Sequence, residues 1–222
     1  MRSTILSVVL VLGTTAASFI TVDTPIDVSQ SARSILHRYP DPLTQSQLLS
    51  IVPTASSCTD APFPSECATA SAALNPILDG FTKYSITTAP EQAALLSWMA
   101  YESGEFKYNQ NHFPGTPGQG TRCMLMPPFV KEYASSIPEL ASQVAGKDDV
   151  AILALVQPDV YSFASAAWFY SAHCTETVKQ GVQTGSESGW AGFLTGCVGT
   201  TVNESREMYW IRAMQALGAP VS

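Results

Sequence analysis

Charged residues are scarce in this chain of 222 residues: they make up 13% of it, whereas hydrophobic residues make up 45%. This balance excludes an intrinsically disordered chain and provides enough apolar material for a core. The formal net charge is −7, and lysines and arginines form no cluster. An acidic chain without a basic patch is a poor candidate for binding nucleic acid or an anionic membrane. The length predicts one domain with, at most, a small extension.

Sequence motifs for metal sites and for serine hydrolases are also missing. The chain contains no CxxC, HxxxH or GxSxG sequence. The spacings of its cysteines and histidines therefore do not suit a zinc site. We expect no cofactor. Its three histidines, His37, His112 and His173, are dispersed. We expect His173 to lie at a helix end, whereas His112 could line a cleft.

The N-terminal apolar run, Ile5 to Gly13, is shorter than the stretch of about 20 residues that spans a bilayer. It follows Arg2 and precedes small residues, which is the pattern of a secretory signal peptide over residues 1–18. We therefore expect a secreted, extracellular protein without a membrane span. Residues 19–56 are interpreted as a propeptide, a linker or an N-terminal extension packed on the core, and residues 57–222 as the domain.

Five cysteines are present, an odd number. In an exported protein, cysteines that can meet become oxidised. Cys58 and Cys67 bracket a proline-rich loop, and Cys174 and Cys197 bracket a segment rich in glycine and serine, so we expect one disulfide within each pair. Cys123 is left over, either as a buried free thiol or as an alternative partner.

Hydrophobic periodicity predicts a mainly α-helical domain. The clearest helix covers residues 89–103, because Pro90 and Glu91 suit a first turn and Gly104 suits an end. The segment from Phe113 to Met126 is expected to form a short loop or hairpin excursion. Other helices are predicted over 67–81 with a break at Asn75, over 127–137, over 148–174 as a buried central helix interrupted near Pro158, and over 203–218.

Glu102 ends the clearest helix among apolar neighbours that include Trp98 and Phe106. Apolar surroundings favour the protonated form of a carboxyl group, because desolvation disfavours the charged form. A protonated carboxylic acid is what a glycosidase needs as its general acid. The alternative is an ordinary glutamate at a helix end, exposed to solvent or bonded to loop amides.

The segment "AYESGEF", residues 100–106, resembles the "ES" signature of the lysozyme-like superfamily, in which the catalytic glutamate ends a helix. In the soluble lytic transglycosylase and goose-type lysozyme families, a segment similar to "GLMQLMPATAKxY" follows some twenty residues later. "TRCMLMPPFVKEYA", residues 121–134, stands in that place here and matches its second half. Thr121 and Met124 replace the glycine and the glutamine of that segment. The resemblance covers about residues 90–175 and implies a lysozyme-like, disulfide-stapled helical domain.

The resemblance also implies an activity. Glu102 would be the general acid of a glycoside hydrolase that cleaves β-1,4 linkages in N-acetylhexosamine polymers, with peptidoglycan as first choice and chitin-type glycan as second. A water or the sugar's own group would complete the reaction. The side chains expected to contact substrate come from the following loop and from the helical segment after it: Tyr108, Asn109, Asn111, His112, Gln119, Thr121, Met124 and Tyr161.

Alternative interpretations stay open at this point. The loop could be an ordinary turn, since asparagine, glycine and proline are the usual turn residues. Glu105 could face the cleft or water. The chain could be a catalytically silent glycan-binding or interaction protein, or Glu102 could be purely structural. Asn203 begins an N-x-S sequence, where glycosylation and helix capping are both plausible.

Overall fold

The computed structural model describes residues 42–219, so the predicted signal peptide and His37 lie outside the described residues. The described part is mainly α-helical, and two isolated antiparallel bridges, Gln110 with Gly120 and Gly120 with Leu125, stand in place of strands. The helices are, in order, α2 (Gln45–Ile51), the 3-10 helix η1 (Pro53–Ser56), α3 (Ala70–Lys83), α4 (Ala89–Glu102), α5 (Pro127–Ser136), α6 (Pro138–Ala141), α7 (Asp149–Val156), α8 (Asp159–Ser162), α9 (Ser165–His173), α10 (Glu176–Gln183), α11 (Glu187–Phe193), the π-helix η2 (Leu194–Val198) and α12 (Glu204–Ala216).

Helix α4 is the centre of the fold, and its start is specified locally. The side chain of Thr88 accepts from the backbone N–H of Glu91, and the Glu91 side chain accepts from the backbone N–H of Thr88, which forms a capping box; Pro90 occupies the first turn. Every residue from 91 to 100 is buried, and α4 packs against α2, α9, α10 and α12. A helix that is buried on all sides carries no apolar stripe, so periodicity alone did not mark α4 as the central helix.

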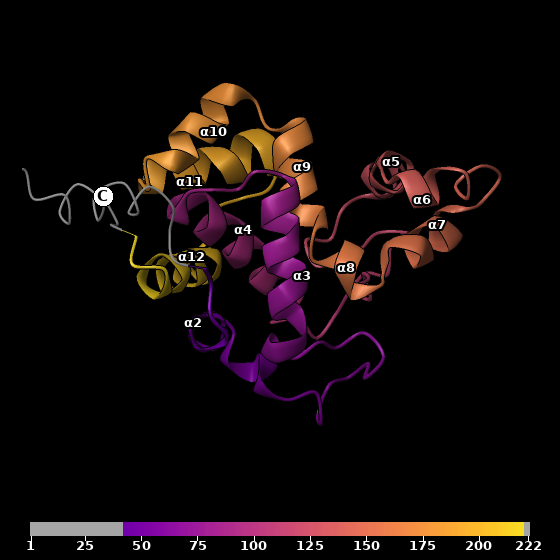
Figure 1. Ribbon diagram of the computed structural model, residues 1–222, viewed down its shortest axis with the longest axis horizontal. Helices are drawn as coiled ribbons and strands as arrows, with labels where there is room; N and C mark the ends of the chain where they lie inside the picture. The colour runs from indigo at the N-terminus through magenta and orange to yellow at the C-terminus, as the bar shows by residue number, and fades with distance from the viewer. Residues whose placement is uncertain (1–41, 220–222) are drawn as a thin grey trace, which may run out of the picture. The chain divides into compact units, whose positions relative to one another are not determined.

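The segment predicted as the buried central helix is instead three helices, α7, α8 and α9. A bend of 97° separates α7 from the α8–α9 pair. The break lies at Pro158, as predicted, because proline cannot donate the hydrogen bond that would continue the helix. Figure 1 shows that α5 to α8 form a lobe beside α3 and α4, while α9 returns to the core.

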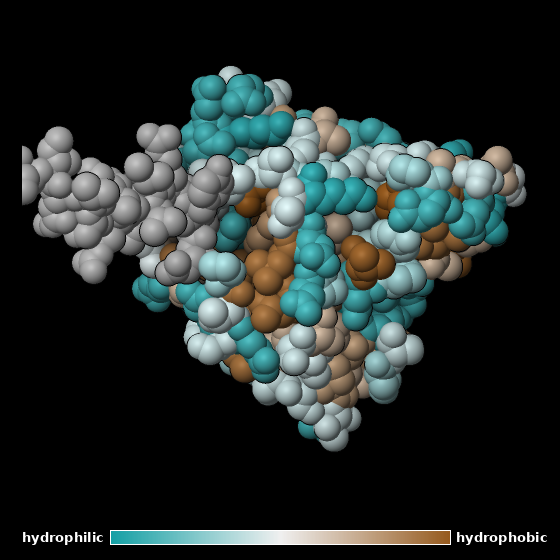
Figure 2. All heavy atoms as spheres, in the orientation of Figure 1, coloured by the Kyte–Doolittle hydropathy of each residue, from teal (hydrophilic) through white to brown (hydrophobic). Residues whose placement is uncertain are grey.

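The predicted break at Asn75 is wrong, because α3 continues through Pro76. The residues of α3 that face the core, Ala73, Ile77 and Phe81, lie on both sides of the proline and are buried. Burying such side chains contributes about 1.5–3 kcal/mol each for the larger ones, which offsets the lost backbone hydrogen bond. Figure 2 shows hydrophilic residues along the exposed side of α3, with apolar surface beside them.

Both predicted disulfides are confirmed. The Cα atoms of Cys58 and Cys67 are 5.9 Å apart, and those of Cys174 and Cys197 are 5.2 Å apart. Cys123 is a buried free thiol, and burial raises its pKa to about 12. The second disulfide joins the end of α9 to η2, so it ties together two helical segments that both pack on the core.

The packed unit begins upstream of residue 57. Leu48, Ile51, Val52 and Ala55 are completely buried, so α2 and η1 pack on the core through these side chains. No helix among residues 42–219 is long and apolar enough to cross a membrane alone; α7 together with α8–α9 reaches that length only across the 97° bend.

Candidate functional site

The chain turns sharply behind Glu102, and Ser103 holds the turn. The Ser103 hydroxyl donates to the carbonyl of Met99 at 2.6 Å and accepts from the backbone N–H of Phe106 at 2.9 Å. Three consecutive residues, Gly104, Glu105 and Phe106, then have left-handed backbone conformations, which are uncommon for residues other than glycine. The serine of the "ES" pair therefore has a physical role: it closes the turn that leaves Glu102 at the end of α4.

Glu102 faces a cation. Its Oε1 lies 2.7 Å from Nη1 of Arg206, in the first turn of α12, and its side chain is 20% exposed. The Arg206 guanidinium in turn lies over the ring of Tyr101, 4.0 Å from its centroid. Trp98 and Phe106, the apolar neighbours expected around the carboxyl group, are buried in the core. The expectation of purely apolar surroundings is therefore wrong, because a residue distant in sequence supplies an ion-pair partner.

A compact loop between α4 and α5 forms the opposite side of the site. Gly120 pairs with both Gln110 and Leu125, and a Cβ atom at Gly120 would overlap the carbonyl oxygen of Asn109. Only glycine fits there. Thr121 and Met124, the two departures from the family segment, both have positive φ angles, of 50° and 52°.

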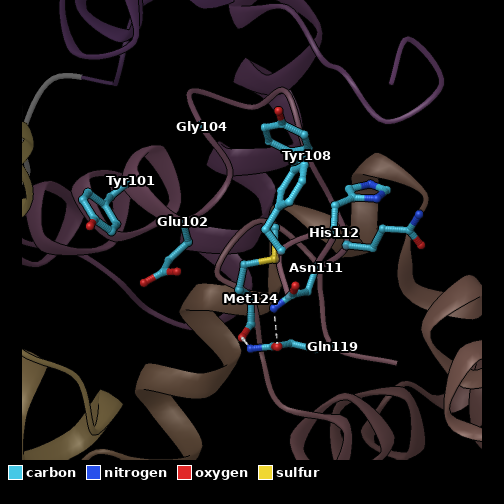
Figure 3. Close-up of a pocket in the computed structure, with 10 residues that line it drawn as sticks. Tyr101, Glu102, Gly104, Tyr108, Asn111, His112, Gln119 and Met124 are labelled. Atoms are coloured by element: carbon cyan, nitrogen blue, oxygen red, sulfur yellow. Dashed lines mark hydrogen bonds between the residues drawn. The ribbon is translucent and has the colours of Figure 1, made fainter. Parts of the chain in front are cut away.

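One pocket, which we call the loop pocket, lies between this loop and the end of α4. Its volume is about 300 Å³. Glu102 lines it together with aromatic, amide and other side chains from the loop (Figure 3): Tyr101, Gly104, Tyr108, Gln110, Asn111, His112, Phe113, Gln119 and Met124. Glu102 is the only carboxylate in this lining.

A second pocket, the helix pocket, adjoins the first. Its volume is about 260 Å³, and it shares Glu102, Gln119 and Met124 with the loop pocket. Its other walls are mostly apolar and include Trp98 and Phe169. We call the two pockets together the groove; Glu102 lies where they meet.

Gln119 is fixed at this junction by two hydrogen bonds, which Figure 3 shows. Its Oε1 accepts from Nδ2 of Asn111 at 2.6 Å, and its Nε2 donates to the carbonyl of Met124 at 3.1 Å. Met124 replaces the glutamine of the family segment, yet an amide side chain is still present in both pockets. It is supplied by Gln119, five positions earlier.

The loop closed by the Cys58–Cys67 disulfide supports the loop pocket from behind. The ring of Phe63 stacks on His112 with centroids 3.6 Å apart. The carboxylate of Glu66, which is 7% exposed, lies 2.8 Å from Nε2 of His112 and accepts from Nε2 of Gln110 at 2.9 Å. These contacts orient two residues that line the loop pocket.

Three residues predicted to contact substrate lie elsewhere. Asn109 is buried; its backbone N–H donates to Glu66 and its Oδ1 accepts from Gln157. Thr121 is completely buried, and its hydroxyl is hydrogen-bonded to Ser165. Tyr161 lies on α8, where its hydroxyl donates to Glu139, because the break at Pro158 takes this segment into the lobe. Of the predicted contact residues, Tyr108, Asn111, His112, Gln119 and Met124 do line the groove with Glu102.

Glu105 and Asn203 have structural contacts. Glu105 is buried and accepts from the backbone N–H of Thr54 at 2.7 Å and from the hydroxyl of Tyr209 at 2.9 Å. This hydrogen bond adds to burial, the larger cause, in raising the pKa of Tyr209 to about 12. Asn203 caps α12 by accepting from the N–H of Arg206 at 2.9 Å and is exposed; its glycosylation stays a prediction.

Sequence reasoning missed Arg206, Glu66, Tyr101 and Gln110. One signal for Arg206 was available: a cation in the first turn of a helix opposes the helix dipole, which favours acids there. Such a residue needs a specific partner, and here the partner is Glu102. Within residues 42–219, no three His, Cys, Asp or Glu side chains form a group that could hold a metal ion.

Comparisons with known proteins give one partial relative. No family model and no solved structure matches the chain. In an alignment 151 residues long that covers 64% of this chain, it is 40% identical to a bifunctional dioxygenase (DOX)-epoxy alcohol synthase (EAS) from Fusarium oxysporum strain Fo5176. The match spans only 12% of that protein's length, so the activities in its name are not carried over to this chain.

Proposed function

We propose that this chain is a secreted glycoside hydrolase with a lysozyme-like fold, which cleaves β-1,4 linkages in N-acetylhexosamine polymers such as peptidoglycan. Glu102 is the general acid. One observation carries the proposal: Glu102 ends a buried helix at the junction of two pockets lined by amide and aromatic groups. Amides suit sugar hydroxyl and acetamido groups, and aromatic rings suit the faces of pyranose rings.

In this mechanism Glu102 gives its proton to the glycosidic oxygen as the bond breaks. No second Asp or Glu lines either pocket, and Glu105 is held by Thr54 and Tyr209. A retaining mechanism with a protein nucleophile needs a second carboxylate about 5 Å away. The lining therefore favours a route in which water or the acetamido group of the substrate attacks the sugar.

The Arg206 ion pair places a condition on this mechanism. A neighbouring cation favours the charged carboxylate, whereas a general acid must carry its proton. Arg206 lies against the carboxylate that would have to reach the glycosidic oxygen, so the mechanism requires that substrate binding separate Arg206 from Glu102.

The same ion pair favours a second candidate, a catalytically silent glycan-binding protein. In that case Arg206 neutralises Glu102 permanently, and the groove binds a sugar chain without cleaving it. The interpretation of Glu102 as a purely structural residue agrees less well with the geometry of the site. That interpretation expected a carboxylate bonded to loop amides, but Glu102 lines two pockets and its carboxylate lies against Arg206.

The test compares the wild type with Glu102→Gln between pH 4 and pH 7, on bacterial cell walls by turbidity and on chitin oligomers by mass spectrometry. Asp79→Asn is the matched control, since it also removes one negative charge, from an exposed site on α3. We expect Glu102→Gln to lose cleavage by at least about 100-fold, which is the usual contribution of a general acid, and Asp79→Asn to keep it. Equal cleavage by wild type and Glu102→Gln, with unchanged circular dichroism, would refute the role of Glu102. Binding without cleavage by the wild type would favour the silent protein.

A further inference from the structure

The charged groups of the groove occur as pairs that neutralise each other. Arg206 is paired with Glu102 at 2.7 Å, and His112, where protonated, is paired with Glu66 at 2.8 Å. Within the described range, 42–219, no other Asp, Glu, Lys, Arg or His lines either pocket. The groove therefore offers no unpaired charge to a ligand.

Arg206 is also poorly placed to take up an anion from solution. Its side chain is 11% exposed, and its Nε and Nη1 atoms are shielded from solvent. The ring of Tyr101 covers the guanidinium at 4.0 Å. An anionic ligand group would have to compete with the carboxylate of Glu102, which is already in contact.

Neighbouring cations are engaged elsewhere. Nζ of Lys107 donates to the carbonyls of Thr54 and Ser57. Arg122 is 1% exposed and paired with Asp159. Among residues 42–219 no lysine or arginine other than Arg206 lines the groove.

Apart from Glu102 and His112, the side chains that line the loop pocket are uncharged. Gln110, Asn111 and Gln119 supply amides. Tyr108 and Phe113 supply aromatic rings, and Phe113 is 80% exposed at the rim. An exposed aromatic ring beside amide groups fits the apolar face and the polar edge of a neutral amino-sugar ring.

From these observations we infer that the groove selects an uncharged N-acetylhexosamine chain, of the chitin type, over a glycan that bears carboxylates, such as one containing muramic acid. The inference rests on the proposed function for the identity of the site. A carboxylate that enters the groove loses water and gains no unpaired cation, which is unfavourable. The net charge of −7 adds repulsion to an anionic polymer.

The experiment measures binding of three tetrasaccharides to the wild-type protein by calorimetry at neutral pH and 5 °C, with mass spectrometry to check that each ligand stays intact. The first is N-acetylglucosamine tetramer. The second alternates N-acetylglucosamine with N-acetylmuramic acid. The third is the second with its lactyl carboxylates converted to carboxamides, which keeps the bulk and removes the charge. We expect the first to bind at least about tenfold more tightly than the second, and the third to recover most of that difference.

Glu102→Gln provides the matched protein variant, because it leaves Arg206 unpaired. Its preference for the uncharged tetramer over the carboxylate tetramer should shrink at least about fivefold. A preference that is unchanged in this variant would overturn the role of the ion pair. Equal or tighter wild-type binding of the carboxylate tetramer, or no millimolar binding of any tetramer, would overturn the inference.

Cleavage is scored separately, by prolonged incubation of the wild type with the same tetramers at acidic pH. Selective binding of the uncharged tetramer without cleavage would keep the inference and reject Glu102 as a general acid. Cleavage of the carboxylate tetramer at an equal or faster rate would keep the general acid and overturn the selectivity.

Discussion

Replacing Ser103 with alanine should have two effects: it should destabilise the protein, and it should displace Glu102. Ser103 is completely buried, and its hydroxyl both donates to Met99 and accepts from the backbone N–H of Phe106. That N–H makes no other hydrogen bond among the described residues. Ser103→Ala therefore removes two hydrogen bonds and leaves one buried donor without an acceptor.

The magnitude follows from these two losses. The bond to Met99 contributes about 1 kcal/mol, and its carbonyl still accepts from the backbone N–H of Ser103. Leaving the Phe106 N–H buried and unpaired costs about 1–3 kcal/mol. We expect a total of about 2–4 kcal/mol in the free energy of unfolding. Ser135→Ala is the matched control, because Ser135 makes the same bond to the carbonyl four residues earlier, at 2.7 Å, but on an exposed helix surface. It should cost less than about 0.5 kcal/mol.

Urea unfolding followed by circular dichroism measures both variants, and cleavage or tetramer binding of Ser103→Ala is measured far below its unfolding midpoint. We expect Ser103→Ala to lose groove function even where it is fully folded, because three left-handed residues follow the turn that it holds. If Ser103→Ala cost no more than Ser135→Ala, the account of how Glu102 is positioned would be wrong.

Two further predictions concern Cys123 and Asn203. Burial raises the pKa of Cys123 from 9.0 to about 12, so its thiol is protonated in both states below pH 9, and above pH 9 only the unfolded chain loses the proton. Between pH 8 and pH 10 the wild type should therefore lose about 1.4 kcal/mol more stability than Cys123→Ala in urea unfolding; identical changes would contradict this burial effect. For Asn203, Asn203→Asp keeps the helix cap but removes the glycan acceptor. Expressed in a eukaryotic secretory host, it should lose the mass of a glycan with unchanged stability, whereas Asn203→Ala should also lose about 1 kcal/mol. Mass differences that match the substitutions alone would mean that Asn203 serves only as a cap.

Local signals were sufficient for α4, α5 and α12, but they gave no prediction of α2, α6, α10 or α11. Thr88, Pro90 and Glu91 specify the start of α4 within four residues, and Pro158 breaks its segment because no neighbour can replace the missing N–H. Pro76 led to a wrong prediction of a helix break, because the effect of a proline depends on the burial of its helix. In α3 the core contacts outweigh the one backbone hydrogen bond that Pro76 removes. The same tertiary burial makes α4 the central helix, and no periodicity reports it. The two disulfides were predictable because each pair brackets a short segment, and because the interpretation of residues 1–18 as a signal peptide favoured oxidised cysteines.

In the candidate site, too, some residues could be predicted from the sequence and others could not. Tyr108, Asn111, His112, Gln119 and Met124 could be predicted because they share one loop with Glu102, so chain connectivity keeps them near it. Contacts that the loop cannot supply came from other elements. Arg206 arrives on the last helix, and its pairing with Glu102 replaces the apolar environment on which the argument for a protonated acid rested. A helix-end glutamate followed by serine thus predicts the position of a candidate acid, because Ser103 builds the turn. Its ion-pair partner comes from a distant part of the chain, so a comparison of wild type with Glu102→Gln bears directly on the proposed mechanism.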